Sequence, residues 1–184
     1  MSTNTTNICY SGGAVGADKA WGEIAIANKH RLIHYVFKNH HGSNGPHAVV
    51  LEKDQLYRAD PHLAAANKIL KRSWPAHSDF VSNLLRRNYF QIRDTEAVYA
   101  VAGIDGNTVF GGTAWAVEMF KNINPSSENI FVFDESANLW YRWRGYNWSV
   151  ENKYDIPRPS GKWTGIGSRE LGKKGSMAIG ELFE

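Results

Sequence analysis

Two glycine-rich turns, one near each end of the chain, are the segments best suited to bind an anion. Residues 11–18 (SGGAVGAD) follow the apolar run 8–10, and residues 165–170 (GIGSRE) follow Trp163 and Thr164. Each segment reads as a strand, a glycine turn and the start of a helix. This geometry presents backbone N–H groups and the positive end of a helix dipole to an anion. Two such turns in one small chain predict a phosphate-bearing ligand, most simply a nucleotide.

Four histidines lie close together in the sequence and raise the question of a metal site. They are His34, His40, His41 and His47, and no cysteine or carboxylate accompanies them at a recognised zinc spacing. A polar surface loop over residues 40–46 accounts for most of them. We therefore expect no metal site.

The segment 140–148 (WYRWRGYNW) holds five aromatic residues and two arginines. Such a mixture can stack the bases of single-stranded nucleic acid, or form a wall against the base of a bound nucleotide. Aromatic hairpins also cover the edge of a core or form a dimer interface. Because the segment alternates as a strand does, we favour a cover or an interface, and we do not expect a nucleic-acid partner.

Length and composition indicate one domain over residues 1–184. The chain is 42% hydrophobic, enough for a sizeable core, and its net charge of +3 is too small to indicate a DNA-wrapping surface. The single cysteine, Cys9, excludes a disulfide framework and suits a reducing compartment. Residues 1–7 are polar, and no apolar run reaches membrane-spanning length, so we expect a cytoplasmic protein.

The elements that position the glycine turns alternate between short apolar strands and helices. We expect strands at residues 8–10, 34–37, 97–102, 130–133 and around 163–164. Helices are expected at 18–28, 63–71, 79–93, 114–120 and 173–183, with Asp60 and Asp79 as N-terminal caps. Residues 97–102 (AVYAVA) are apolar throughout, as in a central parallel strand covered on both faces. The pattern predicts a doubly wound, mainly parallel α/β sheet with ligands at the carboxyl ends of its strands.

The two glycine turns resemble those of the SLOG superfamily, a Rossmann-like group that includes DNA-processing protein A and the Lonely-guy phosphoribohydrolases. Residues 165–170 resemble the first turn of that group and residues 11–18 the second. Most members carry the first turn N-terminal to the second, so the resemblance implies a circular permutation. The terminal helix should then lead in space back to the strand at Ile8. The pattern is most similar to the permuted branch described as molybdenum-cofactor-carrier-like, although no pterin-recognition motif accompanies it.

The central stretch resembles the Lonely-guy enzymes, which carry an arginine on a helix, an apolar strand and a turn of the form PGGxGTxxE. Arg87 takes the place of the arginine, while Gly111, Gly112 and Glu118 match the glycines and the glutamate by spacing. In that family the arginine and the glutamate act on the N-glycosidic bond of a nucleoside monophosphate. Across the whole chain, Asn88, Gln91, Thr113 and the pair Phe133–Asp134 also fall in the order expected from the SLOG resemblance.

Two departures from this motif bear on catalysis. Phe110 replaces the proline of the turn, and residues 114–115 (AW) replace its Gly-Thr pair. Trp115 could narrow the pocket or stack on a base.

The resemblance implies a protein that binds a nucleotide or a nucleotide-derived molecule as a carrier, sensor or sequestering protein. Small SLOG proteins occur in bacteria and phages, where nucleotide signals mediate defence, so such a signal is one candidate ligand. The alternative is a phosphoribohydrolase with Arg87 and Glu118 as catalytic residues. We expect no required cofactor, no membrane partner, and a homo-oligomer. The residues expected to contact the ligand are Ser11, Gly12, Gly13, Ala14, Gly16, Asp18, Asn88, Gly111, Gly112, Thr113, Gly165, Gly167, Ser168 and Arg169.

Overall fold

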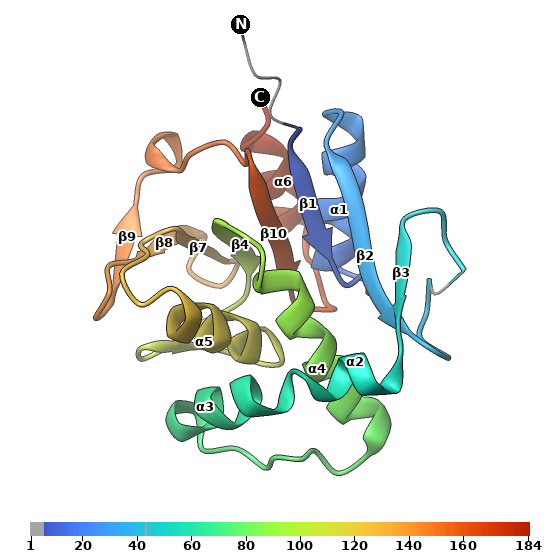
Figure 1. Cartoon of the computed structure of the whole chain (residues 1–184). Helices are drawn as coiled ribbons and strands as arrows, with labels where there is room; N and C mark the ends of the chain where they lie inside the picture. Colours follow the sequence, from blue (N-terminus) through green and yellow to red (C-terminus); the bar gives the residue numbers. More distant parts are fainter. Residues whose placement is uncertain (1–5, 43) are drawn as a thin grey trace, which may run out of the picture.

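The structure is a computed structural model that describes residues 6–42 and 44–184, and one eight-stranded sheet forms its centre (Figure 1). The strand order is β3-β2-β1-β10-β4-β7-β8-β9; the first six strands are parallel to one another, and β8 pairs antiparallel with both β7 and β9. These strands are β1 (Ile8–Ser11), β2 (Arg31–Phe37), β3 (Ala48–Leu51), β4 (Ala97–Val101), β7 (Ile130–Asp134), β8 (Leu139–Trp143), β9 (Trp148–Glu151) and β10 (Lys162–Gly167). A separate small ladder joins β5 (Ile104–Asp105) to β6 (Thr108–Val109).

Helices cover both faces of the sheet. They are α1 (Ala17–Ala27), α2 (Lys53–Tyr57), α3 (Asp60–Leu70), α4 (Asp79–Ile92), α5 (Thr113–Ile123) and α6 (Lys173–Glu181), and Lys153–Asp155 forms a 3₁₀ turn. Across the described ranges, no helix has both the length and the apolar character needed to cross a membrane.

Side-chain alternation along the central strands divides the core into two layers. On β4, Val98 and Ala100 pack with α3, α4 and α5, whereas Tyr99 and Val101 pack with α1 and α6. Because both faces of this strand are buried, its sequence is apolar throughout rather than alternating. The predicted doubly wound α/β fold is confirmed.

The strand order reverses at β10, which lies between β1 and β4. From β1 the chain continues outward to β2 and β3, whereas β4, β7 and the β8–β9 hairpin extend the sheet in the other direction. The two glycine turns follow the adjacent strands β1 and β10, and the Ala17 N–H donates to the Ser168 carbonyl at 2.9 Å. Both turns therefore lie at the same end of the sheet, as expected for turns that follow neighbouring parallel strands.

The C-terminal helix returns to the opposite end of the sheet, where the parallel strands begin. Phe183 packs against Trp163 and His30, with ring centroids 6.0 and 5.7 Å apart. Trp163 is in register with Cys9 on β1, so the end of α6 lies at the same end of the sheet as Ile8 (Figure 1). This is the spatial path expected for the terminal helix.

Two predicted helix caps are wrong. Ser78, not Asp79, caps α4, because its Oγ accepts the Val81 N–H at 3.2 Å. Asp60 lies inside the first turn of α3, where its carboxylate pairs with Arg86 at 2.7 Å instead of accepting from its own helix. A long-range partner decided the orientation of this side chain, and local sequence does not contain that information.

Buried histidines make the stability of the fold depend on pH. Trp163 Nε1 donates to His30 Nδ1 at 3.1 Å, so this ring accepts through a neutral nitrogen, and burial lowers the pKa of His30. Burial, with a smaller contribution from the positive charge of Arg87, lowers the pKa of His40 to about 4. Both side chains are almost fully buried in the native state.

We predict that acidification destabilises the fold between about pH 6.5, the ordinary pKa of histidine, and about pH 4. The unfolded chain takes up protons first in this range, because the native-state pKa of His40 is the lower one. The free energy of unfolding should therefore fall as the pH falls, and His40→Gln should reduce the slope. Urea denaturation at a series of pH values, with the exposed His41→Gln as control, measures this. An unchanged slope in His40→Gln would contradict the assignment.

Candidate functional site

A cavity of about 440 Å³ lies at the carboxyl ends of β10 and β4, beside the turn that follows β1, with α4 and the start of α5 as further walls. Open α/β sheets bind ligands at such a reversal of strand order, and the volume suits a small molecule. The predicted contact residues that line it are Ala14, Asp18, Arg87, Asn88, Gly111, Gly112, Thr113, Gly167, Ser168 and Arg169.

Asp18 lies where the two glycine turns meet. The backbone N–H groups of Gly12, Ala14 and Gly167 face its carboxylate, and Arg87 Nη2 lies 3.6 Å from its Oδ2. Burial raises the pKa of the Asp18 carboxyl, and Arg87 and these amides oppose that rise. The sequence predicted a ligand phosphate at these amides, but in the structure a side chain of the chain itself faces them.

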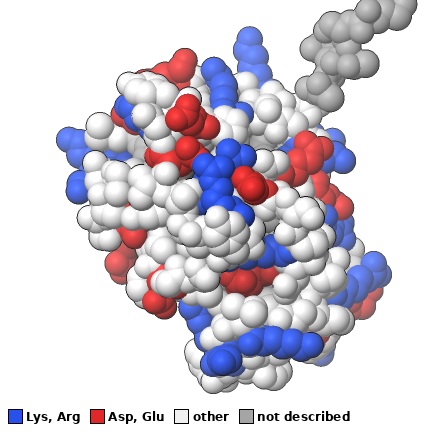
Figure 2. Space-filling model, turned by 90° about the vertical axis from the view of Figure 1, so that its left-hand side faces the viewer, with Lys and Arg blue, Asp and Glu red and all other residues white. Residues whose placement is uncertain are grey.

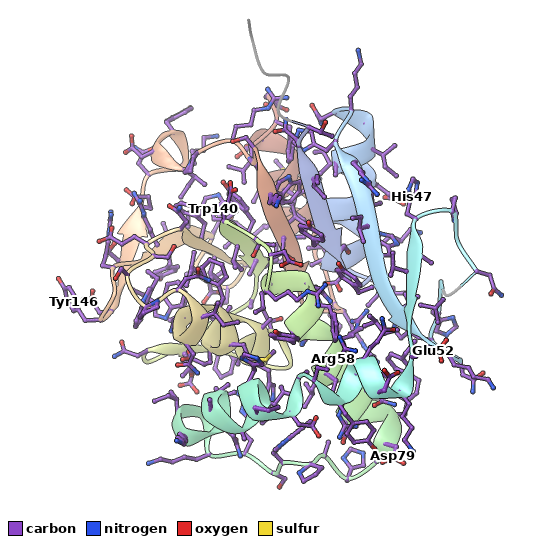
Figure 3. All side chains as sticks on the ribbon, in the orientation of Figure 1. His47, Glu52, Arg58, Asp79, Trp140 and Tyr146 are labelled. Atoms are coloured by element: carbon purple, nitrogen blue, oxygen red, sulfur yellow. The ribbon has the colours of Figure 1, made fainter. Side chains whose placement is uncertain are left out.

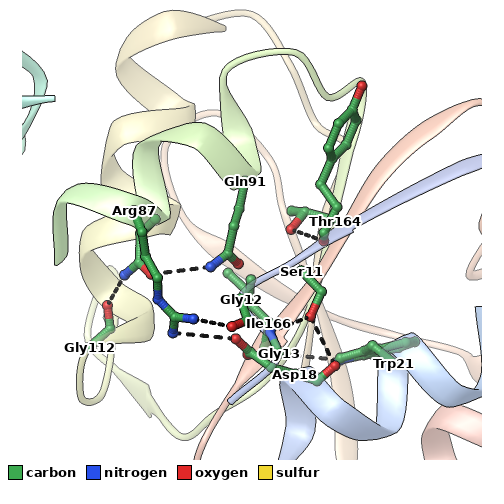
Figure 4. A network of polar contacts seen from close by, with 12 residues as sticks. Ser11, Gly12, Gly13, Asp18, Trp21, Arg87, Gln91, Gly112, Thr164 and Ile166 are labelled. Carbon is green, nitrogen blue, oxygen red and sulfur yellow. Dashed lines mark hydrogen bonds and ion pairs between the residues drawn. The ribbon is translucent and has the colours of Figure 1, made fainter. Parts of the chain in front are cut away.

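Arg87 connects α4 to the first glycine turn (Figure 4). Its Nη1 donates to the Gly12 carbonyl and its Nη2 faces Asp18, whereas its buried Nε has no partner among the described residues. Burial lowers the pKa of this guanidinium, Asp18 raises it, and the nearby Arg169 lowers it. The side chain lines the cavity, and its buried Nε–H is a donor that no described acceptor uses.

Five predicted contact residues support the site from behind instead of lining it. They are Ser11, Gly12, Gly13, Gly16 and Gly165. The Ser11 hydroxyl donates to the Asp18 carbonyl at 3.0 Å and accepts the Gly13 N–H at 3.1 Å. A Cβ at Gly12 would collide with the Arg87 guanidinium, and one at Gly16 would collide with the backbone of Ser168 and Arg169. These glycines allow the two turns and Arg87 to approach closely.

A third glycine turn, formed by Gly111 and Gly112, remains open to the cavity. Gly112 precedes the 11-residue helix α5 without a side-chain cap, and a Cβ at Gly111 or Gly112 would meet no described atom within 4 Å. Arg72 Nη1 holds the Gly111 carbonyl at 2.6 Å, and Asn88 Nδ2 lies 3.4 Å from the Gly112 carbonyl. The first N–H groups of α5 can therefore receive an anion.

Glu118 and Arg87 are not brought together. Glu118 does not line the cavity and pairs with Lys121 at 2.8 Å, and the Lys121 ammonium lies 3.6 Å from the centroid of the Trp143 ring. At 3.6 residues per turn, Glu118 lies about 200° around α5 from Ala116, which does line the cavity. The spacing of Glu118 from the glycines along the sequence does not reveal which side of α5 it occupies.

Trp115 also points away from the cavity. It is buried and packs against Trp74, with ring centroids 5.8 Å apart. It neither narrows the pocket nor reaches a position where it could stack on a base there.

Several cavity residues were missed from the predicted contacts. They are Val81, Leu84, Leu85, Gln91, Ala102, Gly103, Phe110, Ala116 and Ile166. The spacing of Val81, Leu84, Leu85 and Asn88 is that of one helix face, and this signal in the sequence could have identified them. Gln91 is fully buried beside Gly12, and its Oε1 has no partner in the described part of the chain.

The aromatic segment forms the β8–β9 hairpin and covers the core edge. Trp140 and Trp143 are buried against Phe133 and Trp148, whereas Tyr146 projects outward (Figure 3). Acidic and basic side chains adjoin one another on this side of the molecule (Figure 2), and Arg144 contacts Glu128 at 3.2 Å. The burial of Trp140 and Trp143 confirms that the hairpin covers the core, while the expected absence of a nucleic-acid partner stays a prediction. The predicted homo-oligomer stays a prediction.

The histidines of the β2–β3 region do not form a cluster with other potential ligands. In residues 6–42 and 44–184, no group of three or more His, Cys, Asp or Glu side chains could hold a metal ion.

Comparisons with protein-family models, with characterised proteins and with solved structures found no match. The SLOG resemblance therefore depends on the glycine motifs and their order.

We predict that Glu118 stabilises the fold and does not affect ligand affinity. Glu118→Ala leaves the Lys121 ammonium buried without its carboxylate, which should lower the free energy of unfolding by about 3 kcal/mol. Glu118→Ala combined with Lys121→Met should recover most of this loss. Urea denaturation measures both variants, and a Glu118→Ala protein as stable as the parent would contradict this role.

Proposed function

We propose that this protein binds a nucleotide or a nucleotide-derived small molecule and acts as a carrier, sensor or sequestering protein. The observation that carries the proposal is the buried Arg87 in the cavity, with its Nε unpaired among the described residues and the open N-terminus of α5 beside it. An arginine and a helix N-terminus both favour phosphate oxygens.

The phosphate is best accommodated at the third glycine turn. Three amides of the first two turns, those of Gly12, Ala14 and Gly167, already face Asp18. The N–H groups that follow Gly112 have no side-chain cap among the described residues, which favours them for an anion. Arg169 is exposed at the rim of the cavity and adds a second positive charge. Asp18 also lines the cavity, where its carboxylate can accept a hydrogen bond from a ribose hydroxyl.

Binding without turnover agrees best with these positions. Among the described residues that line the cavity, Asp18 is the only carboxylate, and it faces Arg87 and three backbone amides. Glu118, the carboxylate implied by the hydrolase resemblance, pairs with Lys121 elsewhere. We therefore propose a binding protein and not a phosphoribohydrolase.

We predict that Arg87→Ala weakens nucleotide binding about ten- to a hundredfold, because a charge-assisted hydrogen bond contributes about 1.5–3 kcal/mol. Arg169→Ala should weaken it about tenfold without altering thermal stability, because this side chain is exposed. Calorimetric titration with AMP, GMP, CMP and UMP measures affinity. Mass spectrometry of molecules released from the purified protein identifies a co-purified ligand.

The exposed Arg31→Ala is the matched control, because Arg31 begins β2 at the opposite end of the sheet. Equal affinities for the parent, Arg87→Ala and Arg169→Ala would remove this cavity as the binding site. Release of free base from a nucleoside monophosphate, followed by chromatography, would replace the binding protein with the hydrolase.

A further inference from the structure

The face of α4 that lines the cavity changes from apolar to polar along the helix. Val81, Leu84 and Leu85 line the cavity near the start of α4, and Arg87 and Asn88 line it farther along. With a rise of 1.5 Å per residue, Val81 and Asn88 are about 10 Å apart along the axis. A ligand that satisfies both ends has an apolar part and an anionic part.

Phe110 adds an aromatic ring to the same cavity. The ring is 56% exposed, and it packs against Gly103 so closely that a Cβ there would lie 2.5 Å from Phe110 Cδ2. The Phe110 N–H donates to the Gly103 carbonyl at 2.9 Å, and Arg72 holds the carbonyl of the following residue. These two bonds hold the backbone that carries the ring at the edge of the cavity, while much of the ring stays uncovered.

We propose that Phe110 and the apolar start of α4 form a stacking subsite for the planar base of the bound nucleotide. The subsite rests on the proposed function, since its occupant is the base of a molecule whose phosphate lies at the start of α5. Phe110 and Gly112 are two residues apart, so one small ligand can reach both positions. The uncovered ring is a stacking platform of the kind that base-binding proteins use.

The chemistry of the subsite determines its selectivity. Val81, Leu84, Leu85 and Phe110 offer no side-chain donor or acceptor to the edge of a base. Stacking tolerates all bases, because each has a π face. The four nucleoside monophosphates should therefore bind with affinities within about tenfold of one another.

Calorimetric titration with AMP and with ribose 5-phosphate, which lacks the base, tests the subsite. Phe110→Ala should weaken AMP binding about ten- to a hundredfold and leave ribose 5-phosphate binding within about twofold. Phe110→Trp should retain the affinity for AMP. Tyr146→Ala is the matched control, because Tyr146 is an exposed aromatic residue that does not line the cavity.

The outcomes separate this inference from the proposed function. Unchanged AMP affinity in Phe110→Ala, or binding of ribose 5-phosphate but of no nucleotide by the parent, overturns the stacking subsite alone. An equal loss for AMP and ribose 5-phosphate also overturns it, because the ring then acts only through the glycine turn. Failure of the parent to bind ribose 5-phosphate or any of the four nucleoside monophosphates counts against the proposed function itself.

Discussion

The pairing of Asp18 with Arg87 is the interaction on which the architecture of the site depends. Both side chains are only 7% exposed, and burying each ion costs several kcal/mol before its partners offset that cost. The offset comes from their mutual attraction and from the amides of two glycine turns that are far apart in sequence. A single buried pair thereby ties α1, α4 and the ends of β1 and β10 together.

This pairing also determines which of the glycine turns beside the cavity face a side chain of the protein. Amides of the first two glycine turns, those of Gly12, Ala14 and Gly167, face a carboxylate of the protein. The start of α5 has no such internal partner among the described residues, and its turn is open. Similar glycine turns thus differ in whether one of the protein's own side chains faces their N–H groups.

On the side of α5 away from the cavity, a buried pair of opposite charges stabilises the fold. Glu118 and Lys121 pair beneath the β8–β9 hairpin, and two tryptophan rings enclose the ammonium. The hairpin extends the sheet beyond β7, and Trp140 and Trp143 bury its inner side. The aromatic residues here stabilise the sheet edge, whereas Phe110 presents a ring to the cavity.

The sequence by itself determined the α/β class and the glycine turns at strand ends, because these follow from periodicity and glycine placement. Arg87 was indicated only by the resemblance of the central stretch to a known motif. Tertiary structure alone decided that Asp18 faces the first two turns, that Glu118 and Trp115 point away from the cavity, and that Phe110 lines it. The direction of a side chain depends on the phase of its helix against distant elements and on which partner reaches it first. Motif spacing gives the position of a residue along the chain, but not this direction.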